Sequence, residues 1–124
     1  MALNVLIVDD SAAIRKILQR VLVQAEVSLG SVYEASDGQE AIAKLKNAPD
    51  VNLILADVNM PNMDGLELLG RLRTNKAWKD VPVLMVTTEG SQNKVMQALQ
   101  LGATGYLRKP FTADQIKEKL VGII

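Results

Sequence analysis

The hydrophobic positions of this chain follow two alternating patterns. Short apolar runs rich in β-branched residues indicate strands buried on both faces, whereas apolar residues at intervals of three and four indicate helices with one buried side. The runs predict strands over residues 4–8, 31–35, 51–56, 81–86 and 104–107. Helices are predicted to follow each strand, with Ser11 and Thr112 as caps of the first and last helices, and Asp37 and Gly38 as the turn that starts the second.

The alternation of strands and helices determines the expected fold class. Repeated β-α units with short connections favour a parallel sheet with helices on both faces and right-handed crossovers. We therefore expect an α/β fold with a single doubly wound, five-stranded parallel sheet, and we expect residues 1–124 to form one domain. The strand order 2-1-3-4-5 is common for such sheets; we adopt it from the fold class and do not derive it from this sequence.

Polar residues follow the predicted strands at their carboxyl ends, where open α/β sheets bind their ligands. The first and third strands both end in acidic residues, and in the adopted order these two strands are neighbours that flank the point where the winding reverses. The sequence therefore predicts the functional site at this edge. The residues placed there are Asp9, Asp10, Asp37, Asp57, Thr87 and Lys109.

The carboxylates of Asp9, Asp10 and Asp57 are expected to lie close together at this edge. Two carboxylates ~4 Å apart repel each other by about 4 kcal/mol at an effective dielectric constant of about 20, so three of them need a counter-charge. A hard divalent cation with oxygen ligands meets this need, and Mg²⁺ suits a site with few protein ligands and several waters. Lys109 and one divalent cation would together neutralise the three carboxylates.

Two absent residue types restrict the chemistry further. The chain has no Cys and no His, which excludes disulfides, zinc-thiolate sites, thiol nucleophiles, Ser-His-Asp triads and phosphohistidine. Asp57 remains as the candidate nucleophile, because an ordinary aspartate, with a pKa of about 3.9, is ionised at neutral pH without a general base. Carboxylates also serve as phosphoryl acceptors, and Mg²⁺ with Lys109 would neutralise the phosphoryl oxygens during transfer.

The overall composition is typical of a small globular protein. Apolar residues make up 48% and charged residues 23% of the chain, and 14 basic side chains balance 14 acidic ones. A net charge of zero provides no overall field for nucleic acid or anionic lipid, so we expect neither as a partner. The longest apolar run is far shorter than the roughly 18 residues of a membrane span, and no signal peptide is visible. We expect a cytoplasmic monomer.

Several short motifs occur along the chain in a fixed order. They are Asp9-Asp10-Ser11, Asp57-Val58-Asn59-Met60-Pro61, Met63-Asp64-Gly65, Met85-Val86-Thr87, Gly102-Ala103, Tyr106 and Lys109-Pro110-Phe111. In order and spacing, this set resembles the receiver domains of two-component response regulators, and in particular the single-domain chemotaxis regulators. The resemblance covers the whole chain and implies a flavodoxin-like receiver domain over residues 1–124.

The resemblance implies how the acidic cluster would work. Asp57 would be phosphorylated by the phosphohistidine of a sensor histidine kinase. Asp10, Asp57 and the backbone carbonyl of Asn59 would bind Mg²⁺ directly. Asp9 would be held to the ion mainly through water.

The resemblance also implies a switch. Thr87 and Lys109 would contact the phosphoryl group, and Tyr106 would turn inward into the space that Thr87 vacates. A charge-assisted hydrogen bond of ~1.5–3 kcal/mol would shift a two-state equilibrium roughly 10- to 150-fold. The surface formed by the fourth helix, the fifth strand and the fifth helix would then bind an effector. Such a protein is a signalling switch that catalyses only its own phosphorylation and dephosphorylation.

Other residues bear on the lifetime of the phosphoryl group and on the partner. Asn59 and Glu89 occupy positions that tune self-hydrolysis in the family, and together they predict a short-lived phosphoryl state. Ser91 and Gln92 stand where chemotaxis members often carry two lysines. The effector therefore stays open between a flagellar motor switch component and another protein, and a phosphatase is a further candidate partner.

Alternative functions differ in how well the sequence accommodates them. A flavin carrier needs a phosphate loop rich in Gly and hydroxyl groups after the first strand, where Asp9 and Asp10 would repel a phosphate. An aspartyl phosphatase needs a general acid two residues after its nucleophile, and Asn59 cannot serve. A phosphorelay or phosphate-sink receiver remains open, as does a protein-binding module that works without phosphorylation.

Overall fold

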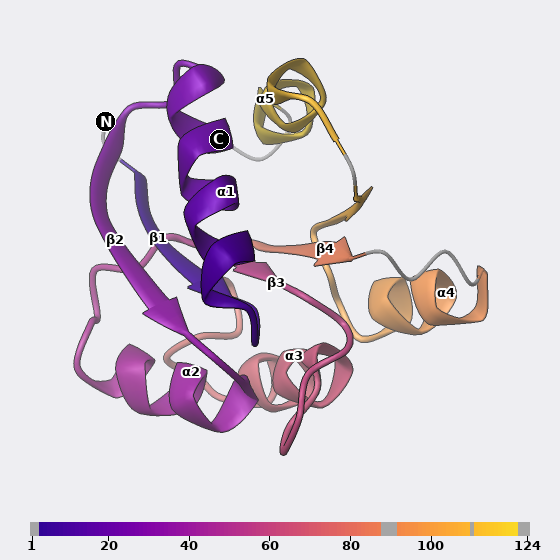
Figure 1. The fold of residues 1–124 in the computed structure, drawn as a ribbon. Helices are drawn as coiled ribbons and strands as arrows, with labels where there is room; N and C mark the ends of the chain where they lie inside the picture. The colour runs from indigo at the N-terminus through magenta and orange to yellow at the C-terminus, as the bar shows by residue number, and fades with distance from the viewer. Residues whose placement is uncertain (1–2, 88–91, 110, 122–124) are drawn as a thin grey trace.

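The strands and helices alternate along the whole chain in the computed structural model, which describes residues 3–87, 92–109 and 111–121 (Figure 1). The strands are β1 (Leu3–Val8), β2 (Leu29–Ala35), β3 (Leu53–Ala56), β4 (Val83–Thr87) and β5 (Gly105–Arg108). The helices are α1 (Ala12–Gln24), α2 (Gly38–Lys46), α3 (Gly65–Arg73), α4 (Gln92–Gln100) and α5 (Ala113–Val121). The strands form one parallel sheet in the order β2-β1-β3-β4-β5, which confirms the predicted fold class and the adopted order.

Helices cover both faces of the sheet, as Figure 1 shows. Val5 and Ile7 of β1 belong to a buried cluster that includes apolar residues of α1 and α5. Leu6 and Val8 belong to a second cluster, which includes residues of α2, α3 and α4. Because successive side chains of a strand point to opposite faces, each central strand must be apolar at every position. This requirement explains why the strands are visible in the sequence as uninterrupted apolar runs.

The starts of three strands differ from the prediction by two residues. β3 and β4 begin two residues later than predicted, and β4 extends one residue further, whereas β2 begins at Leu29, two residues earlier. Val51 and Val81 each donate their N–H to a carbonyl in the preceding turn, and Pro82 has no N–H to donate to a neighbouring strand. Burial of Val51 outside the strand made the apolar run longer than the strand itself.

Side chains cap the starts of several helices. Ser11 accepts a hydrogen bond from the N–H of Ile14 at the start of α1, and Thr112 accepts one from the N–H of Gln115 at the start of α5. These contacts confirm the two predicted caps. Asp37 caps α2 by accepting from the N–H of Glu40 at 2.8 Å. Each such contact satisfies one of the N–H groups that a helix start leaves without an intrahelical partner.

We expect Asp37→Ala to lower the free energy of unfolding by about 1 kcal/mol at neutral pH, because α2 loses its cap. The hydrogen bond from the N–H of Glu40, followed by that from the Asn62 side chain, holds the pKa of Asp37 below its usual 3.8. A lowered pKa in the folded state stabilises the protein above the ordinary pKa, and this contribution disappears as the pH falls through the lowered value. The difference between wild type and Asp37→Ala should therefore shrink below about pH 4.

Urea denaturation at a series of pH values measures this difference. Asp37→Asn is the matched control, because Asn still offers an oxygen to the N–H of Glu40 and is a good cap residue. It should lose less stability than Asp37→Ala at neutral pH. A difference between wild type and Asp37→Ala that grows toward acid pH would contradict the assignment.

Candidate functional site

Three carboxylates meet at the carboxyl edge of the sheet, as the sequence predicted. Asp9 and Asp10 follow β1, and Asp57 follows the adjacent β3, whose pairing with β1 continues through a hydrogen bond of 3.0 Å from the N–H of Asp57 to the carbonyl of Val8. One carboxylate oxygen from each of the three acids lies within 4.8 Å of the other two. Asp9 is buried, Asp57 is half-buried and Asp10 is exposed, so the cluster opens toward solvent on the side of Asp10.

Lys109 supplies a positive charge to this cluster. Its Nζ lies 2.8 Å from Oδ2 of Asp9 and 3.6 Å from Oδ2 of Asp57. The side chains of Lys109 and Asp57 are only 14% and 13% exposed, which matters because the attraction between largely buried charges is screened little by solvent. One lysine against three carboxylates leaves a formal surplus of two negative charges.

The three acids differ in how far the protein already satisfies them. Asp9 is fully engaged, because Oδ1 accepts a hydrogen bond from the N–H of Ser11 and Oδ2 accepts one from Lys109. Asp57 accepts a long hydrogen bond of 3.4 Å from the N–H of Asn59. Within the described residues, the carboxylate of Asp10 has no hydrogen-bond or ion-pair partner.

This arrangement fits a hard divalent cation. All the donors are oxygens, the surplus of two negative charges equals the charge of such an ion, and the exposed Asp10 leaves access for water. Because the oxygens of Asp9 are already bonded within the protein, Asp10 and Asp57 are the carboxylates best placed for direct coordination.

Gly65 lies directly against the backbone of Asp57, and this close approach was not predicted from the sequence. A Cβ atom at this position would collide with the backbone carbonyl oxygen of Asp57, so α3 can begin this close to the site only with glycine. The N–H of Gly65 donates to the carbonyl of Val58 at 2.9 Å, and the side chain of Asp64 caps the helix. A glycine directly after a capping aspartate was the signal in the sequence.

The loop between β3 and α3 is tied to the start of α2. The N–H of Gly38 donates to the carbonyl of Met63 at 3.0 Å, and Nδ2 of Asn62 donates to Oδ2 of Asp37 at 2.9 Å. Asn62 has a φ of 65°, in the left-handed region that Asn adopts more readily than most residues. Both contacts hold the end of the loop that leads into α3, and Asn59 lies exposed near the start of the loop, beside Asp57.

Tyr106 and Asp37, which the sequence predicted for the switch and for the sheet edge, lie outside the three-carboxylate cluster. Tyr106 lies in β5 beside Met85 of β4 and is half-buried against the cluster beneath α2, α3 and α4. Asp37 caps α2 and is not part of the three-carboxylate cluster. Thus Tyr106 is connected to the site through the neighbouring strands, whereas Asp37 lies outside the cluster and bonds Asn62 of the loop before α3.

Several predicted residues are described only in part. Thr87 ends β4 and its backbone pairs with Arg108, which places it one residue from Lys109 in register. The side chains of Thr87 and Gln92 lie outside the described part of the structure, as do all atoms of Glu89 and Ser91.

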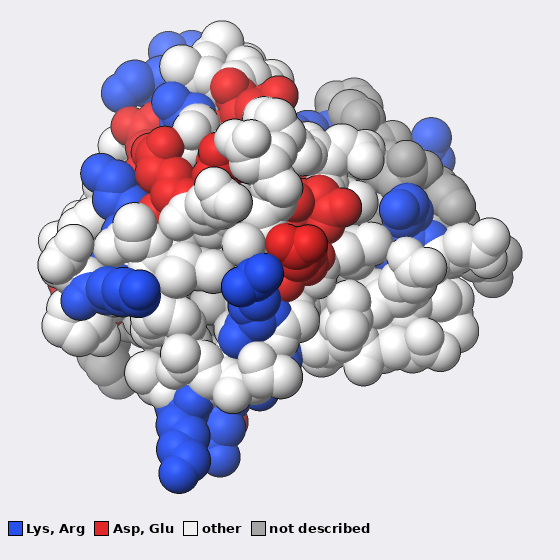
Figure 2. All heavy atoms as spheres, turned by 90° about the horizontal axis from the view of Figure 1, so that it is seen from below, with Lys and Arg blue, Asp and Glu red and all other residues white. Residues whose placement is uncertain are grey.

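Charges of both signs are distributed over the surface. On the face shown in Figure 2, acidic and basic side chains are interspersed, and neither sign forms a continuous field across it. This face therefore offers no single-sign surface of the kind that binds nucleic acid. Among the described residues, no helix has the length and apolar character needed to cross a membrane.

Comparisons with known proteins agree with this geometry. Residues 5–121 match the response regulator receiver domain family. A relative described as "Chemotaxis protein CheY homolog" from Campylobacter jejuni is 40% identical over 122 residues, which cover 98% of this chain and 92% of the relative. "Chemotaxis protein CheY1" from Helicobacter pylori is 39% identical over 118 residues, covering 95% of this chain and 94% of the relative.

Solved structures show the same fold. Chemotaxis response regulator CheY4 of Vibrio cholerae superimposes with a TM-score of 0.86 at 38% identity, and the match covers 100% of both chains. A chain in the CheX-CheY-BeF3-Mg+2 complex from Borrelia burgdorferi superimposes with a TM-score of 0.88 at 30% identity. That match covers 98% of this chain and 88% of the other.

We expect Gly65→Ala to lower the free energy of unfolding by about 1–3 kcal/mol, because the added methyl group must displace the backbone of Asp57. Urea denaturation measures the change. Gly70→Ala in the same helix is the matched control, since its Cβ would approach only Leu101, at 3.9 Å. The control should leave stability unchanged or raise it by up to about 1 kcal/mol, because Ala is the better helix former. Equal effects of the two substitutions would show that Gly65 does not support Asp57.

Proposed function

The chain belongs to the response regulator receiver domain family, and from that premise we propose that it is a signalling switch in which Asp57 accepts a phosphoryl group from a sensor histidine kinase. The observation that carries the proposal is the cluster of Asp9, Asp10 and Asp57, two of which, Asp9 and Asp57, lie within ion-pair distance of Lys109. We further propose that residues 1–124 form one receiver domain that acts as a monomer.

The residues have distinct parts in the transfer. An oxygen of Asp57 attacks the phosphorus atom, the bond from phosphorus to the histidine nitrogen of the kinase breaks, and an acyl phosphate forms on Asp57. Lys109 already lies 3.6 Å from Oδ2 of Asp57, so its ammonium group can pair with a phosphoryl oxygen bound there. Asp10, Asp57 and the backbone carbonyl of Asn59 would hold Mg²⁺, with Asp9 bound through water. The ion, when bound, supplies the positive charge that offsets the incoming phosphoryl oxygens.

The position of Thr87 at the end of β4 supports a proposal for how phosphorylation would reach the effector-binding surface. The hydroxyl of Thr87 would move to hydrogen-bond the phosphoryl group, and Tyr106 would turn inward beside the neighbouring Met85. The surface of α4, β5 and α5 would change with it and bind an effector. The half-buried setting of Tyr106 fits this role, because part of its side chain is still available for burial.

The relatives support a place in chemotaxis signalling. Two relatives of nearly full coverage are described as chemotaxis proteins, so we propose a flagellar motor switch component as the effector. The chain from Borrelia burgdorferi was solved together with CheX, which supports a further protein partner for this chain, and a phosphatase is one candidate for that partner. The cytoplasmic location remains a prediction from the sequence.

Phosphorylation from a small donor tests the proposal. We expect the wild-type chain, incubated with acetyl phosphate and Mg²⁺, to gain the mass of one phosphoryl group in a base-labile form. Asp57→Asn should gain none, and EDTA should abolish the gain in wild type. Asp37→Asn is the control, because it removes another aspartate at a strand end that is outside the cluster. No gain in wild type, or an undiminished gain in Asp57→Asn, would overturn the proposal.

The lifetime of the phosphoryl group provides a separate test of Asn59 and Glu89. We expect the phosphoryl group to be lost rapidly from the purified protein without any added phosphatase. Mass spectrometry at intervals after removal of the donor measures this loss. Asn59→Ala and Glu89→Ala should change the decay rate several-fold, since both residues are proposed to influence the attacking water. Asn47→Ala, at the end of α2 where the side chain donates to the carbonyl of Ala43, should leave the rate unchanged. A phosphoryl group that persists in the wild-type protein contradicts this expectation.

A further inference from the structure

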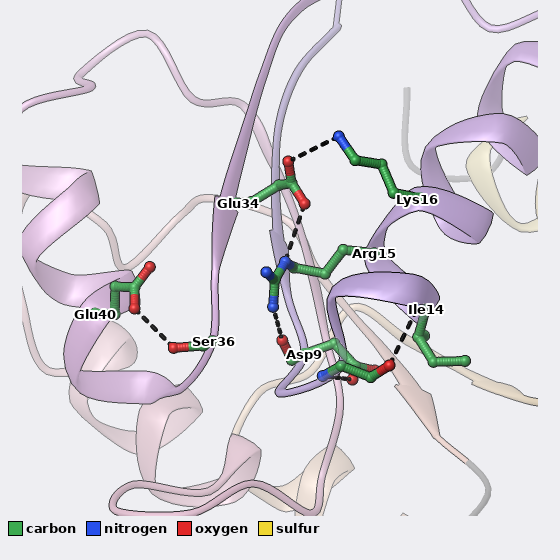
Figure 3. Close-up of polar contacts among 8 residues, drawn as sticks. Asp9, Ile14, Arg15, Lys16, Glu34, Ser36 and Glu40 are labelled. Atoms are coloured by element: carbon green, nitrogen blue, oxygen red, sulfur yellow. Dashed lines mark hydrogen bonds and ion pairs between the residues drawn. The ribbon is translucent and has the colours of Figure 1, made fainter.

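Arg15 connects three parts of the molecule beside the acidic cluster. From α1, its Nε donates to Oε1 of Glu34 on β2 at 3.0 Å, and its Nη1 donates to the backbone carbonyl of Asp9 at 2.6 Å. Figure 3 shows the guanidinium group between these two acceptors. The side chain of Arg15 is 16% exposed, so both contacts are partly shielded from water. Charge-assisted hydrogen bonds of this kind are stronger than those between neutral groups.

The carbonyl that Arg15 contacts belongs to the peptide group that joins Asp9 to Asp10. The other polar groups of Asp9 are also hydrogen bonded, since its N–H donates to Ala35 and both carboxylate oxygens accept. The side chain of Asp10, in contrast, has no partner among the described residues. Its direction therefore depends on the orientation of the preceding peptide group, which Arg15 holds.

We propose that Arg15, itself held by Glu34, is a positioning residue that orients the Asp9–Asp10 peptide and thereby aims the carboxylate of Asp10 at a bound divalent cation. This inference rests on the proposed function, because it concerns the cation of that same site. Residues that orient metal ligands without touching the metal commonly change metal affinity by about 10- to 100-fold when they are substituted.

The charge of Arg15 makes the inference testable by the direction of the effect. A positive charge near a cation site weakens cation binding by electrostatic repulsion. If Arg15 acted only through its charge, its removal would strengthen Mg²⁺ binding. If Arg15 positions Asp10, its removal weakens Mg²⁺ binding even though a positive charge is lost.

Lys16 provides the matched control. It is the next residue of α1, and its Nζ approaches Oε2 of the same Glu34 at 3.6 Å, as Figure 3 shows. Its side chain is 68% exposed. Among the described residues, Lys16 makes no hydrogen bond or ion pair with Asp9. Substitution of Lys16 therefore removes one positive charge next to Glu34 without releasing the carbonyl of Asp9.

The experiment compares the wild-type chain with Arg15→Met, Arg15→Lys and Lys16→Met. Isothermal titration calorimetry with Mg²⁺ gives the Kd without any phosphoryl donor. We expect Arg15→Met to raise the Kd about 10-fold. We expect Arg15→Lys to raise the Kd by a smaller factor, because the single ammonium group of Lys replaces a guanidinium group that bonds two acceptors at once. Lys16→Met should leave the Kd unchanged or lower it slightly.

Amide hydrogen exchange in Mg²⁺-free protein provides a readout that does not involve the ion. The amides of Asp10 and Ser11 should exchange faster in Arg15→Met than in wild type, and at the wild-type rate in Lys16→Met. Urea denaturation verifies that each variant is folded. If Arg15→Met is not folded, Arg15→Lys carries the test, and a wild-type Kd in that variant would overturn the inference.

The outcomes separate this inference from the proposed function. Wild type that binds Mg²⁺, together with an Arg15→Met variant that binds it equally or more tightly, overturns the positioning role and leaves the proposed function intact. Wild type that binds no Mg²⁺ overturns the proposed cation site, and the inference with it. Weaker binding in Arg15→Met with unchanged binding in Lys16→Met supports both.

Discussion

Mutual repulsion among three carboxylates is the constraint on which the functional edge of this protein depends. Asp9, Asp10 and Asp57 can lie within 4.8 Å of one another only because opposite charge is available. Lys109 provides part of it and reaches two of the acids from beyond β5, across the intervening β4. The ion pairs therefore connect the last strand of the sheet to its centre. The remaining negative charge makes the edge receptive to a divalent cation.

Groups behind the acids hold the backbone on which their side chains stand. Gly65 allows α3 to begin against the carbonyl of Asp57, and Arg15 holds the carbonyl of Asp9 from the opposite side. Such support matters because metal ligands must be placed within a fraction of an ångström, and the groups behind them set that placement. The exposed Asp10 is the member of the cluster that depends most on this support.

The same ion pairs give the proposed switch its physical basis. A phosphoryl group on Asp57 would bring new negative charge to within reach of Lys109, which is already bonded to Asp9. The balance of contacts at the ends of β4 and β5 would then change, and Tyr106 lies on β5 beside Met85. A local change of charge can thereby alter the surface of α4, β5 and α5, provided that the packing there has two stable arrangements.

The sequence by itself determined the alternation of strands and helices, the caps at Ser11 and Thr112, and the position of the three acids at strand ends, because these follow from local periodicity and from the rule that parallel strands end at one edge. The three acids meet because β1 and β3 are neighbours, and that strand order is a property of the fold which the structure confirms. Only the tertiary structure decided where the strands begin, since Val51 is buried by packing outside β3. It also decided which acid is buried, and which distant groups meet: Lys109 bonds Asp9 across 100 residues, and Arg15 bonds Glu34 across 19. Such contacts depend on how the helices pack over the sheet, and no local pattern encodes those distances.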